Sequence, residues 1–208
     1  MSDSWGPDYD IDHDSAKSVQ NRSALLLTGG SSRRMGTDKA SLIVGNEPLA
    51  QRLARQLLDN GWKPTVLGRS GLEGYAFLPD REPNAGPLAA LRGFSPTSDL
   101  IFVLSCDVPL FDPILCEVLA NLIGAKDAAI PMIQGKIQPL CALYRKEAWQ
   151  KLVEVPSNRI FDWVETLDSL IVSEGEFHKL GADPVWCAGA NTPQEFRSLT
   201  GIPTGTVE

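Results

Sequence analysis

The chain has 208 residues, of which 43% are hydrophobic, so it can bury the core of one ordinary domain. Its formal net charge of −7 argues against broad binding to nucleic acids or anionic membranes, both of which favour a basic surface. No apolar run approaches the roughly 18 residues of a membrane span, so we expect a soluble protein without nucleic-acid or membrane partners.

The first 22 residues differ in composition from the rest of the chain. They hold five aspartates together with Lys17 and Arg22, but few large aliphatic residues. Such a segment cannot bury enough apolar surface to offset the entropy of ordering it. It also lacks the basic start and apolar middle of a secretory signal. We therefore predict a disordered acidic extension over residues 1–22 and a single domain over residues 23–208.

From residue 23 onward, short apolar runs alternate with helical patterns. The predicted strands are Ala24–Thr28, Thr65–Leu67, Tyr75–Leu78, Leu100–Leu104 and Ala128–Met132. The predicted helices between them are Pro48–Asn60, Pro87–Phe94 and Pro113–Ile123. Several of these strands are apolar at nearly every position, which indicates that helices cover both of their faces. The alternation predicts an α/β fold with a mostly parallel sheet.

The last third of the chain is less regular. The predicted elements there are a strand at Pro139–Tyr144, short helices at Glu147–Glu154 and Phe161–Leu167, a strand at Val185–Ala190 and a helix at Thr192–Thr200. The last helix has the strongest start signal, because Thr192, Pro193 and Glu195 form the pattern of a capping box.

The cysteines argue against a zinc site and against a redox pair. They are Cys106, Cys116, Cys141 and Cys187. Their spacing matches no zinc-ligand pattern and no C-x-x-C motif, and each lies in or beside an apolar segment. We predict buried free thiols in a reducing compartment and hence a cytoplasmic protein.

The segment LLLTGGSSRRMGTDKA, residues 25–40, combines glycines and cations directly after the first predicted strand. Gly29 and Gly30 would let a ligand approach the backbone closely. The cations that follow are Arg33, Arg34 and Lys39, which could neutralise phosphate oxygens. The segment is neither a P-loop nor a G-x-G-x-x-G motif. Its composition alone leaves a phosphate cradle and a charged surface turn both open.

Two carboxylates also follow predicted strands. Asp107, in IFVLSCDVPLF, is placed to hold Mg²⁺, which one or two carboxylates and substrate phosphates typically bind. Asp80 ends the run YAFLPD, and Gly86 then leads into a helix whose amino terminus could face an anion or a base. In isolation, Asp107 fits a turn or cap aspartate before proline better than a metal ligand, and the Asp80 segment fits a routine strand–turn–helix joint as well as a ligand site. A phosphate cradle nearby favours the metal interpretation.

Four segments in order resemble the motifs of the molybdenum cofactor guanylyltransferases, the MobA-like proteins. LTGGSSRRMGTDKA resembles the signature L-A-G-G-x-S-x-R-M-G-x-D-K, and NAGPLAAL resembles G-P-L-A-G. SCDVP resembles C-D-x-P, and ANTPQEF resembles N-x-N-T-P-E-E-L. Two further segments, QPLCALYRKEAW and SNRIFDWV, resemble segments that line the far side of the substrate cleft in that family. The motifs span residues 24–197, nearly the whole predicted domain.

The resemblance implies a Rossmann-like, three-layer α/β/α fold of the nucleotide-diphospho-sugar transferase type. It implies a Mg²⁺-dependent transfer of GMP from GTP to the terminal phosphate of molybdopterin or the molybdenum cofactor, with release of pyrophosphate. The product is a guanine dinucleotide cofactor. The implied partners are GTP, molybdopterin and, transiently, proteins that synthesise or accept the cofactor.

The resemblance also assigns roles residue by residue. Nucleotide binding falls to Leu27, Thr28, Gly29, Gly30, Lys39, Asp80, Gly86 and Asp107. Catalysis falls to Lys39, Arg33, Arg34 and Asp107, with Asp107 as the metal ligand. Substrate binding on the pterin side falls to Asn191, Asn158 and Arg159.

The sequence departs from the family's motifs in three places. Thr28 stands where alanine is usual, and Gly189 stands where an asparagine often precedes N-T-P. After Val66, the chain reads VLGRSG where the family tends to have a V-N-A-N-like run. These departures leave open a related nucleotidyltransferase that uses CTP or another phosphate acceptor. They also leave open a nucleotide-binding paralogue without catalysis.

Overall fold

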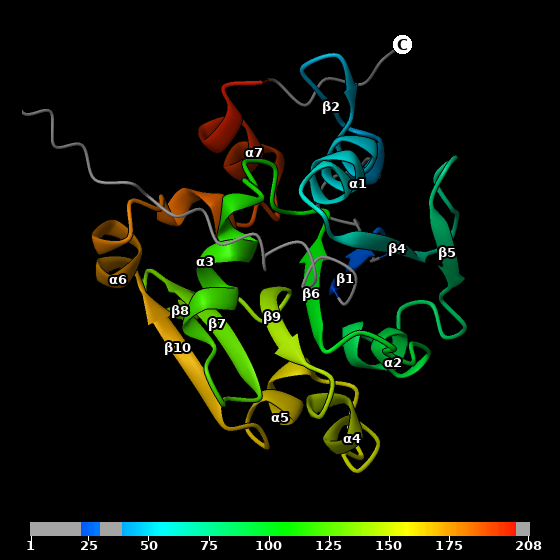
Figure 1. Cartoon of the computed structure of the whole chain (residues 1–208). Helices are drawn as coiled ribbons and strands as arrows, with labels where there is room; N and C mark the ends of the chain where they lie inside the picture. The colour runs from blue at the N-terminus through cyan, green and yellow to red at the C-terminus, as the bar shows by residue number, and fades with distance from the viewer. Residues whose placement is uncertain (1–21, 30–38, 203–208) are drawn as a thin grey trace, which may run out of the picture.

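The computed structural model describes residues 22–29 and 39–202. These residues fold around one large central sheet. Its strands are β1 (Arg22–Leu27), β4 (Lys63–Gly68), β5 (Ala76–Pro79), β6 (Leu100–Ser105), β7 (Ala128–Ile133), β8 (Lys136–Ile137), β9 (Cys141–Arg145) and β10 (Ser169–Ser173). The strand order is β10-β7-β9-β6-β1-β4-β5, and β8 pairs with β7 (Figure 1). The acidic segment 1–21 lies outside the described residues, and β1 begins at Arg22.

Most strands of the sheet are parallel. Strand β1 lies between β4 and β6 and is parallel to both, and β5 is parallel to β4. Strand β9 is antiparallel to its neighbours β6 and β7. The carboxyl ends of β5, β4, β1 and β6 therefore lie side by side at one edge of the sheet. In open α/β sheets, this is the edge at which ligands bind.

Helices cover both faces of the sheet. They are α1 (Leu49–Asp59), α2 (Pro87–Arg92), α3 (Ile114–Leu122), α4 (Ala148–Leu152), α5 (Ile160–Val164), α6 (Glu174–Lys179) and α7 (Pro193–Thr200). Side chains of α1, α3, α6 and α7 share one hydrophobic core with Ala24 and Leu26 of β1. Side chains of α2, α4 and α5 share a second core with Leu25 and Leu27. Alternate residues of one strand thus enter opposite cores, and the predicted three-layer α/β/α fold is confirmed.

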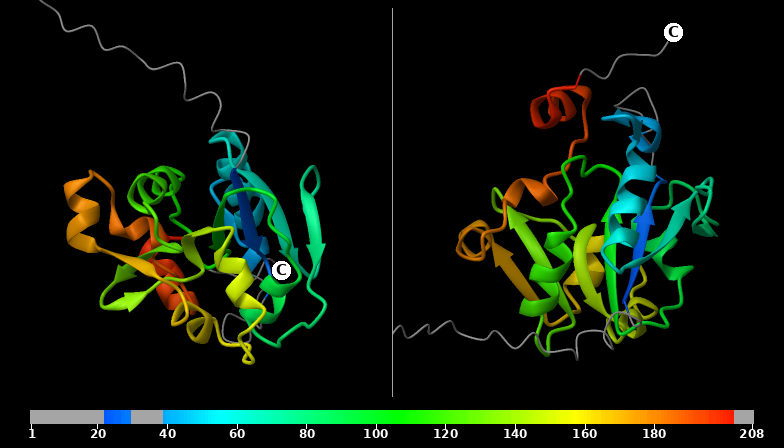
Figure 2. Two further views of the ribbon diagram at one scale, coloured as in Figure 1. Left: turned by 60° about the horizontal axis from the view of Figure 1, so that its bottom comes forward. Right: turned by 45° about the horizontal axis from the view of Figure 1, so that its top comes forward.

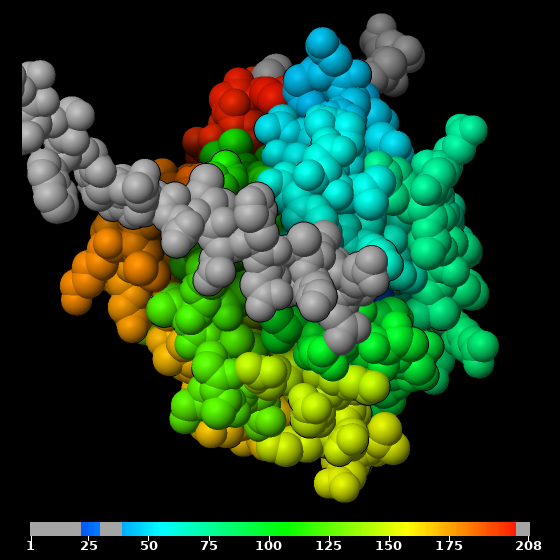
Figure 3. Space-filling view, viewed as in Figure 1, coloured from blue at the N-terminus to red at the C-terminus, as the bar shows by residue number. Residues whose placement is uncertain are grey.

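The arrangement can be followed in the figures. Figure 1 shows α2, α4 and α5 together in the lower part of the view, and Figure 2 shows the sheet from two further directions. In the space-filling view of Figure 3, the coloured elements form a continuous surface from α6 in orange to β5 in teal. None of the helices in the described ranges is long and apolar enough to cross a membrane.

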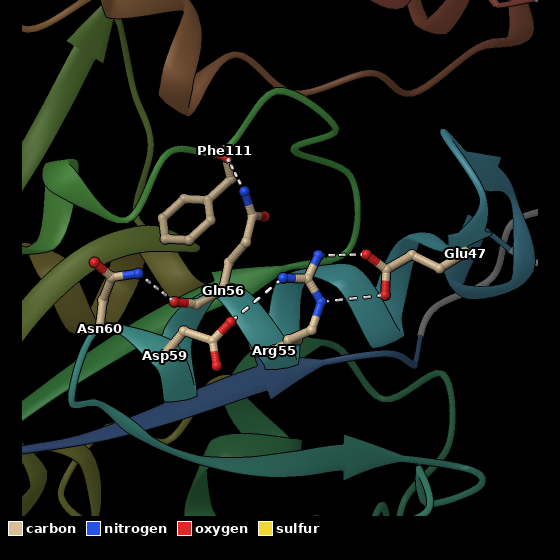
Figure 4. Close-up of polar contacts among 6 residues, drawn as sticks. All are labelled: Glu47, Arg55, Gln56, Asp59, Asn60 and Phe111. Atoms are coloured by element: carbon tan, nitrogen blue, oxygen red, sulfur yellow. Dashed lines mark hydrogen bonds and ion pairs between the residues drawn. The ribbon is translucent and has the colours of Figure 1, made fainter.

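Helix α1 holds the small hairpin of β2 (Ile43–Val44) and β3 (Glu47–Pro48) on its polar side. The Arg55 guanidinium donates to both carboxylate oxygens of Glu47, at 2.5 and 3.4 Å, and to Asp59 at 3.3 Å (Figure 4). Gln56 donates to the carbonyl oxygen of Phe111 at 3.4 Å, beyond the helix. The hairpin follows Lys39 in the chain, so these contacts help to fix the segment that begins at Lys39.

One predicted strand is wrong, and several elements, among them β10 and α6, were not predicted. Residues Pro184–Cys187 form a 3-10 helix, η4, where a strand was expected over Val185–Ala190. The reason is local, because the Asp183 side chain caps the helix by accepting from Val185 N at 2.9 Å, and Pro184 occupies the first turn. Strand β10 and helix α6 were missed, although the Ser173–Glu176 capping box is visible in the sequence as SEGE.

Two further predictions from the sequence are confirmed. The predicted helix over Thr192–Thr200 is confirmed as α7, and its capping box joins Thr192 and Glu195. All four cysteines are buried, as predicted, and each is a free thiol.

Candidate active site

A cleft of about 310 Å³ opens at the carboxyl edge of the parallel strands. It brings together most of the residues to which the sequence resemblance assigned roles. Those that line it are Leu27, Thr28, Gly29, Lys39, Asp80, Gly86, Asp107 and Asn191. They come from segments as far apart as β1 and the start of α7, so only the folded chain forms this cleft.

Three polar side chains converge at one end of the cleft. Lys39 Nζ donates to Asn191 Oδ1 at 3.2 Å and lies 4.0 Å from Asp107 Oδ2. The Lys39 side chain is 17% exposed and that of Asp107 is 26% exposed, so both are largely shielded yet open to a ligand. Partial shielding strengthens their electrostatic interaction with a bound anion relative to one in water.

Backbone hydrogen bonds hold Asp107 in place. Cys106 N donates to Leu27 O at 3.0 Å, which ties the turn after β6 to the end of β1. Ala190 N donates to Asp107 O at 2.7 Å, which ties the same turn to the segment before α7. These bonds fix the turn that carries Asp107 between the end of β1 and the segment before α7.

The cap of α7 positions Asn191. The backbone N–H groups of Asn191 and Thr192 donate to Glu195 Oε2 at 2.6 and 3.1 Å, and Glu195 N donates to Thr192 Oγ1 at 3.2 Å. A local sequence signal, the capping box, thus orders the residue whose side chain reaches Lys39 from the other end of the chain.

Gly189 lies directly beside Asp107. A Cβ at Gly189 would lie 3.8 Å from the Asp107 carboxylate, which is ordinary van der Waals contact. The position therefore does not require glycine. Because glycine stands where the family often has an asparagine, no side-chain amide from position 189 contacts the Asp107 carboxylate.

The opposite end of the cleft carries Asp80. Asp80 N donates to Gly68 O at 2.8 Å, and Asp80 Oδ1 accepts from Glu82 N at 3.1 Å. Asp80 Oδ2 lies 3.7 Å from the position that a Cβ on Gly29 would take. The carboxylate therefore faces the glycine that follows β1, and its second oxygen borders the cleft.

Gly86 forms the wall of the cleft at the start of α2. Its φ of 109° is unfavourable for other residues, and a Cβ there would come within 2.7 Å of Asn158 O. Arg92 holds the segment behind it, because its guanidinium donates to Asn158 Oδ1, Val155 O and Ser157 O at 2.5 to 2.6 Å.

Some predicted site residues do not lie in this cleft. Asn158 packs behind Gly86, and Arg159 is largely exposed, 3.9 Å from Asp162, so neither lines it. Gly30, Arg33 and Arg34 lie outside the residues that the structure describes. Asn84 also lines the cleft and was missed. Its position within the motif NAGPLAAL was a signal that could have identified it.

The residues present fit a magnesium site that a substrate completes. No cluster of three or more His, Cys, Asp or Glu side chains suited to a metal occurs among residues 22–29 and 39–202. A single carboxylate in a cleft is sufficient where phosphate oxygens supply further ligands, as is common for Mg²⁺. Asp107 satisfies this condition, because it lies in the cleft beside Lys39.

Comparisons with known proteins identify the family to which the chain is similar. The family described as MobA-like NTP transferase domain matches residues 24–170. The probable molybdenum cofactor guanylyltransferase of Bacillus subtilis is 30% identical over 185 residues, 84% of this chain and 92% of that protein. The protein of the same description from Carboxydothermus hydrogenoformans is 26% identical over 192 residues, 88% of this chain and 98% of that protein.

A solved structure shares the fold. The crystal structure of molybdopterin-guanine dinucleotide biosynthesis protein A from Archaeoglobus fulgidus superposes with a TM-score of 0.69 at 20% identity. The match covers 86% of this chain and 97% of that one. Together with the family match over residues 24–170, it confirms the resemblance seen in the sequence, and the chain belongs to the family of MobA-like NTP transferases.

Proposed function

We propose that this protein is a nucleotidyltransferase that transfers GMP from GTP to the terminal phosphate of molybdopterin or its molybdenum form. The observation that carries the proposal is the convergence of Lys39, Asp107 and Asn191 in one cleft at the carboxyl edge of the sheet. The family membership and the relatives described as probable molybdenum cofactor guanylyltransferases support the same reaction.

The strand order suggests how GTP lies in the cleft. Asp107 follows β6 and Asp80 follows β5, with β1 and β4 between them. Asp80 thus follows a strand three places away from that of Asp107, although its carboxylate reaches back to Gly29 beyond the end of β1. We place the α-phosphate near Lys39 and Asp107 and the nucleoside toward Asp80. The acceptor phosphate then enters from the side of Asn191.

The reaction needs alignment and charge neutralisation rather than a protein nucleophile. An oxygen of the acceptor phosphate forms a bond to the α-phosphorus, and the bond from that phosphorus to the bridging oxygen breaks. The electron pair leaves on pyrophosphate. The Lys39 ammonium offsets charge at the α-phosphate, and Asn191 holds Lys39 in place. Asp107 would hold Mg²⁺, which when bound supplies further charge neutralisation at the phosphate oxygens.

Asp80 favours guanine over cytosine on chemical grounds. A carboxylate only accepts hydrogen bonds, and guanine presents two adjacent donors, N1–H and the 2-amino group, on one edge. Cytosine presents a single amino donor on the corresponding edge. A carboxylate at the nucleoside end of the cleft therefore pairs with guanine through two hydrogen bonds.

The test is a nucleotide panel with the full chain. The protein is incubated with Mg²⁺, molybdopterin and each of the four nucleoside triphosphates, and pyrophosphate release is followed with acceptor-free controls. We expect release with GTP that depends on the acceptor. Release with CTP alone would replace the guanylyl proposal with a cytidylyl one. Bound nucleotide without release would contradict transfer and indicate a binding protein.

A further inference from the structure

Strands β1 and β4 end side by side. At this point Gly68 has no side chain, and Thr28 carries a hydroxyl group. Gly68 is buried at the end of β4. A Cβ on Gly68 would overlap Thr28 Oγ1 and come within 3.1 Å of Gly29 N. Any side chain at position 68 therefore requires Thr28 to move. The Thr28 hydroxyl can keep its present position only if residue 68 is glycine.

The Thr28 hydroxyl has a weak internal partner. Oγ1 donates to Leu67 O at 3.4 Å, whereas hydrogen bonds between oxygens usually measure about 2.5 to 3.0 Å. The same carbonyl also accepts from Thr28 N at the better distance of 2.9 Å. A hydroxyl can donate once and accept twice, so Oγ1 can form stronger hydrogen bonds with a ligand in the cleft that Thr28 lines.

The location of this pair assigns it to the nucleoside half of the cleft. Gly68 O accepts from Asp80 N at 2.8 Å, so the pair lies next to Asp80. Strand β1 lies between β4 and β6, so Gly68 is one strand further from Asp107 than Thr28, which follows β1 directly. Two departures from the family's motifs, Thr28 and the segment VLGRSG that contains Gly68, therefore meet at a single point.

We propose that Thr28 and Gly68 form a coupled pair that determines recognition of the nucleoside. The Thr28 side chain occupies the space that a side chain at position 68 would take, and its hydroxyl hydrogen-bonds the nucleoside of the bound nucleotide. This inference rests on the proposed function, because it requires a nucleotide in the cleft. It adds a specificity-determining side chain to the nucleotide-binding role that the resemblance implied for Thr28.

The first experiment measures equilibrium binding with the full chain and Mg²⁺ but without acceptor. Thr28→Val keeps the shape of the side chain and removes the hydroxyl, whereas Thr28→Ser keeps the hydroxyl. We expect Thr28→Val to weaken GTP binding roughly 3- to 10-fold, the usual range for one hydrogen bond. Thr28→Ser should remain within about twofold of the wild type, and all three proteins should bind pyrophosphate equally. Equal GTP affinity of Thr28→Val and the wild type would overturn the proposal.

Two analogues identify the group on the nucleoside. If the hydroxyl contacts the ribose 2′-OH, Thr28→Val will not affect the affinity for 2′-deoxy-GTP. If it contacts the 2-amino group of guanine, Thr28→Val will not affect the affinity for inosine triphosphate. An equal loss of affinity for pyrophosphate would instead place the hydroxyl on the phosphates and contradict the nucleoside assignment.

The second experiment tests the coupling. Gly68→Ala is made in the wild type and in Thr28→Ala, which opens space for the added methyl group. We expect Gly68→Ala to weaken GTP binding at least about tenfold in the wild type but to have little further effect in Thr28→Ala. Independent effects of the two substitutions would overturn the coupling. If Gly68→Ala fails to fold alone, rescue of folding by Thr28→Ala reports the same coupling.

The matched control is Gly175→Ala in α6, where the added methyl group would meet only Ser173 Oγ, at 4.0 Å. This substitution should leave GTP affinity unchanged. Because GTP binding is measured without acceptor, the experiments test the inference independently of the proposed transfer reaction. A wild type that binds GTP but transfers nothing contradicts only the transfer, whereas normal transfer with an insensitive Thr28→Val contradicts only the inference.

Discussion

At the scale of single residues, the cleft is built from weak, open contacts rather than closed ion pairs. Lys39 and Asp107 are 4.0 Å apart, the outer limit of an ion pair, and Asn191 holds the lysine at 3.2 Å. A tighter Lys39–Asp107 pair would have to be broken before either group could contact phosphate or a metal. The observed spacing instead leaves both charges available to a triphosphate.

Removal of the Asp107 charge tests its role directly. Asp107→Asn keeps the size of the side chain and should lower kcat for pyrophosphate release at least about 100-fold, as expected for loss of a group that stabilises developing charge. Asp112→Asn is the matched control, because Asp112 caps the turn at Ile114 N and its amide variant can still accept that bond. The unfolding midpoint should stay unchanged in both variants. Near-normal turnover of Asp107→Asn with added Mg²⁺ would exclude Asp107 as the metal ligand.

At the scale of elements, one arginine joins two segments that build the cleft wall. Arg92, at the end of α2, donates to three acceptors in residues 155–158. The same segment supports Gly86 through Asn158 O, and Gly86 lines the cleft. Arg92 therefore acts on the cleft through Asn158 and is a positioning residue.

Loss of the Arg92 contacts should affect both stability and nucleotide binding. Arg92→Met removes hydrogen bonds from a charged donor and should lower the free energy of unfolding by roughly 2–4 kcal/mol. Because Gly86 loses its support, KM for GTP should rise more than kcat falls. Arg92→Lys should recover part of both effects. The control Arg197→Met, on the exposed surface of α7, should change stability by no more than about 0.5 kcal/mol. An unchanged KM for GTP in Arg92→Met would refute the positioning role.

At the scale of the whole molecule, the four cysteines belong to the same hydrophobic core on one face of the sheet. Burial raises the pKa of Cys187 to about 12. Burial also raises the pKa of Cys116 and of Cys141 well above the ordinary value of 9.0, and at Cys141 the neighbouring thiols act in the same direction. These thiols keep their protons in the folded protein.

Stability should therefore fall at alkaline pH. A thiol whose pKa is raised by folding stabilises the folded protein fully at pH values below the pKa that the thiol has in the unfolded chain. This contribution is lost as the pH rises toward the pKa of the thiol in the folded protein. Each such thiol can lower the free energy of unfolding by up to about 1.4 kcal/mol per pH unit above about pH 9. Urea unfolding between about pH 7 and pH 10 should show this slope, and Cys116→Ala should reduce it. An identical slope in Cys116→Ala, or rapid thiol labelling of the native protein, would contradict the prediction.

Local patterns predicted most of the fold because their causes are local. Strand β6 and residues 24–27 of β1 are apolar at nearly every position because helices cover both faces of these strands. The start of α7 follows from its capping box. The failures are local as well, since η4 depends on a cap at Asp183 and a proline that the apolar run over Val185–Ala190 obscured.

The sequence by itself determined the α/β class, the family and the chemical character of the site. Lys39 and Asp107 could be identified because each belongs to a motif near the end of a strand. Only the tertiary structure decided that Asn191 reaches Lys39, that Asn158 lies behind Gly86 and that Thr28 fills the space beside Gly68. The physical reason is that these contacts depend on strand order and register. Both are set by packing between segments far apart in the chain, which no local pattern encodes.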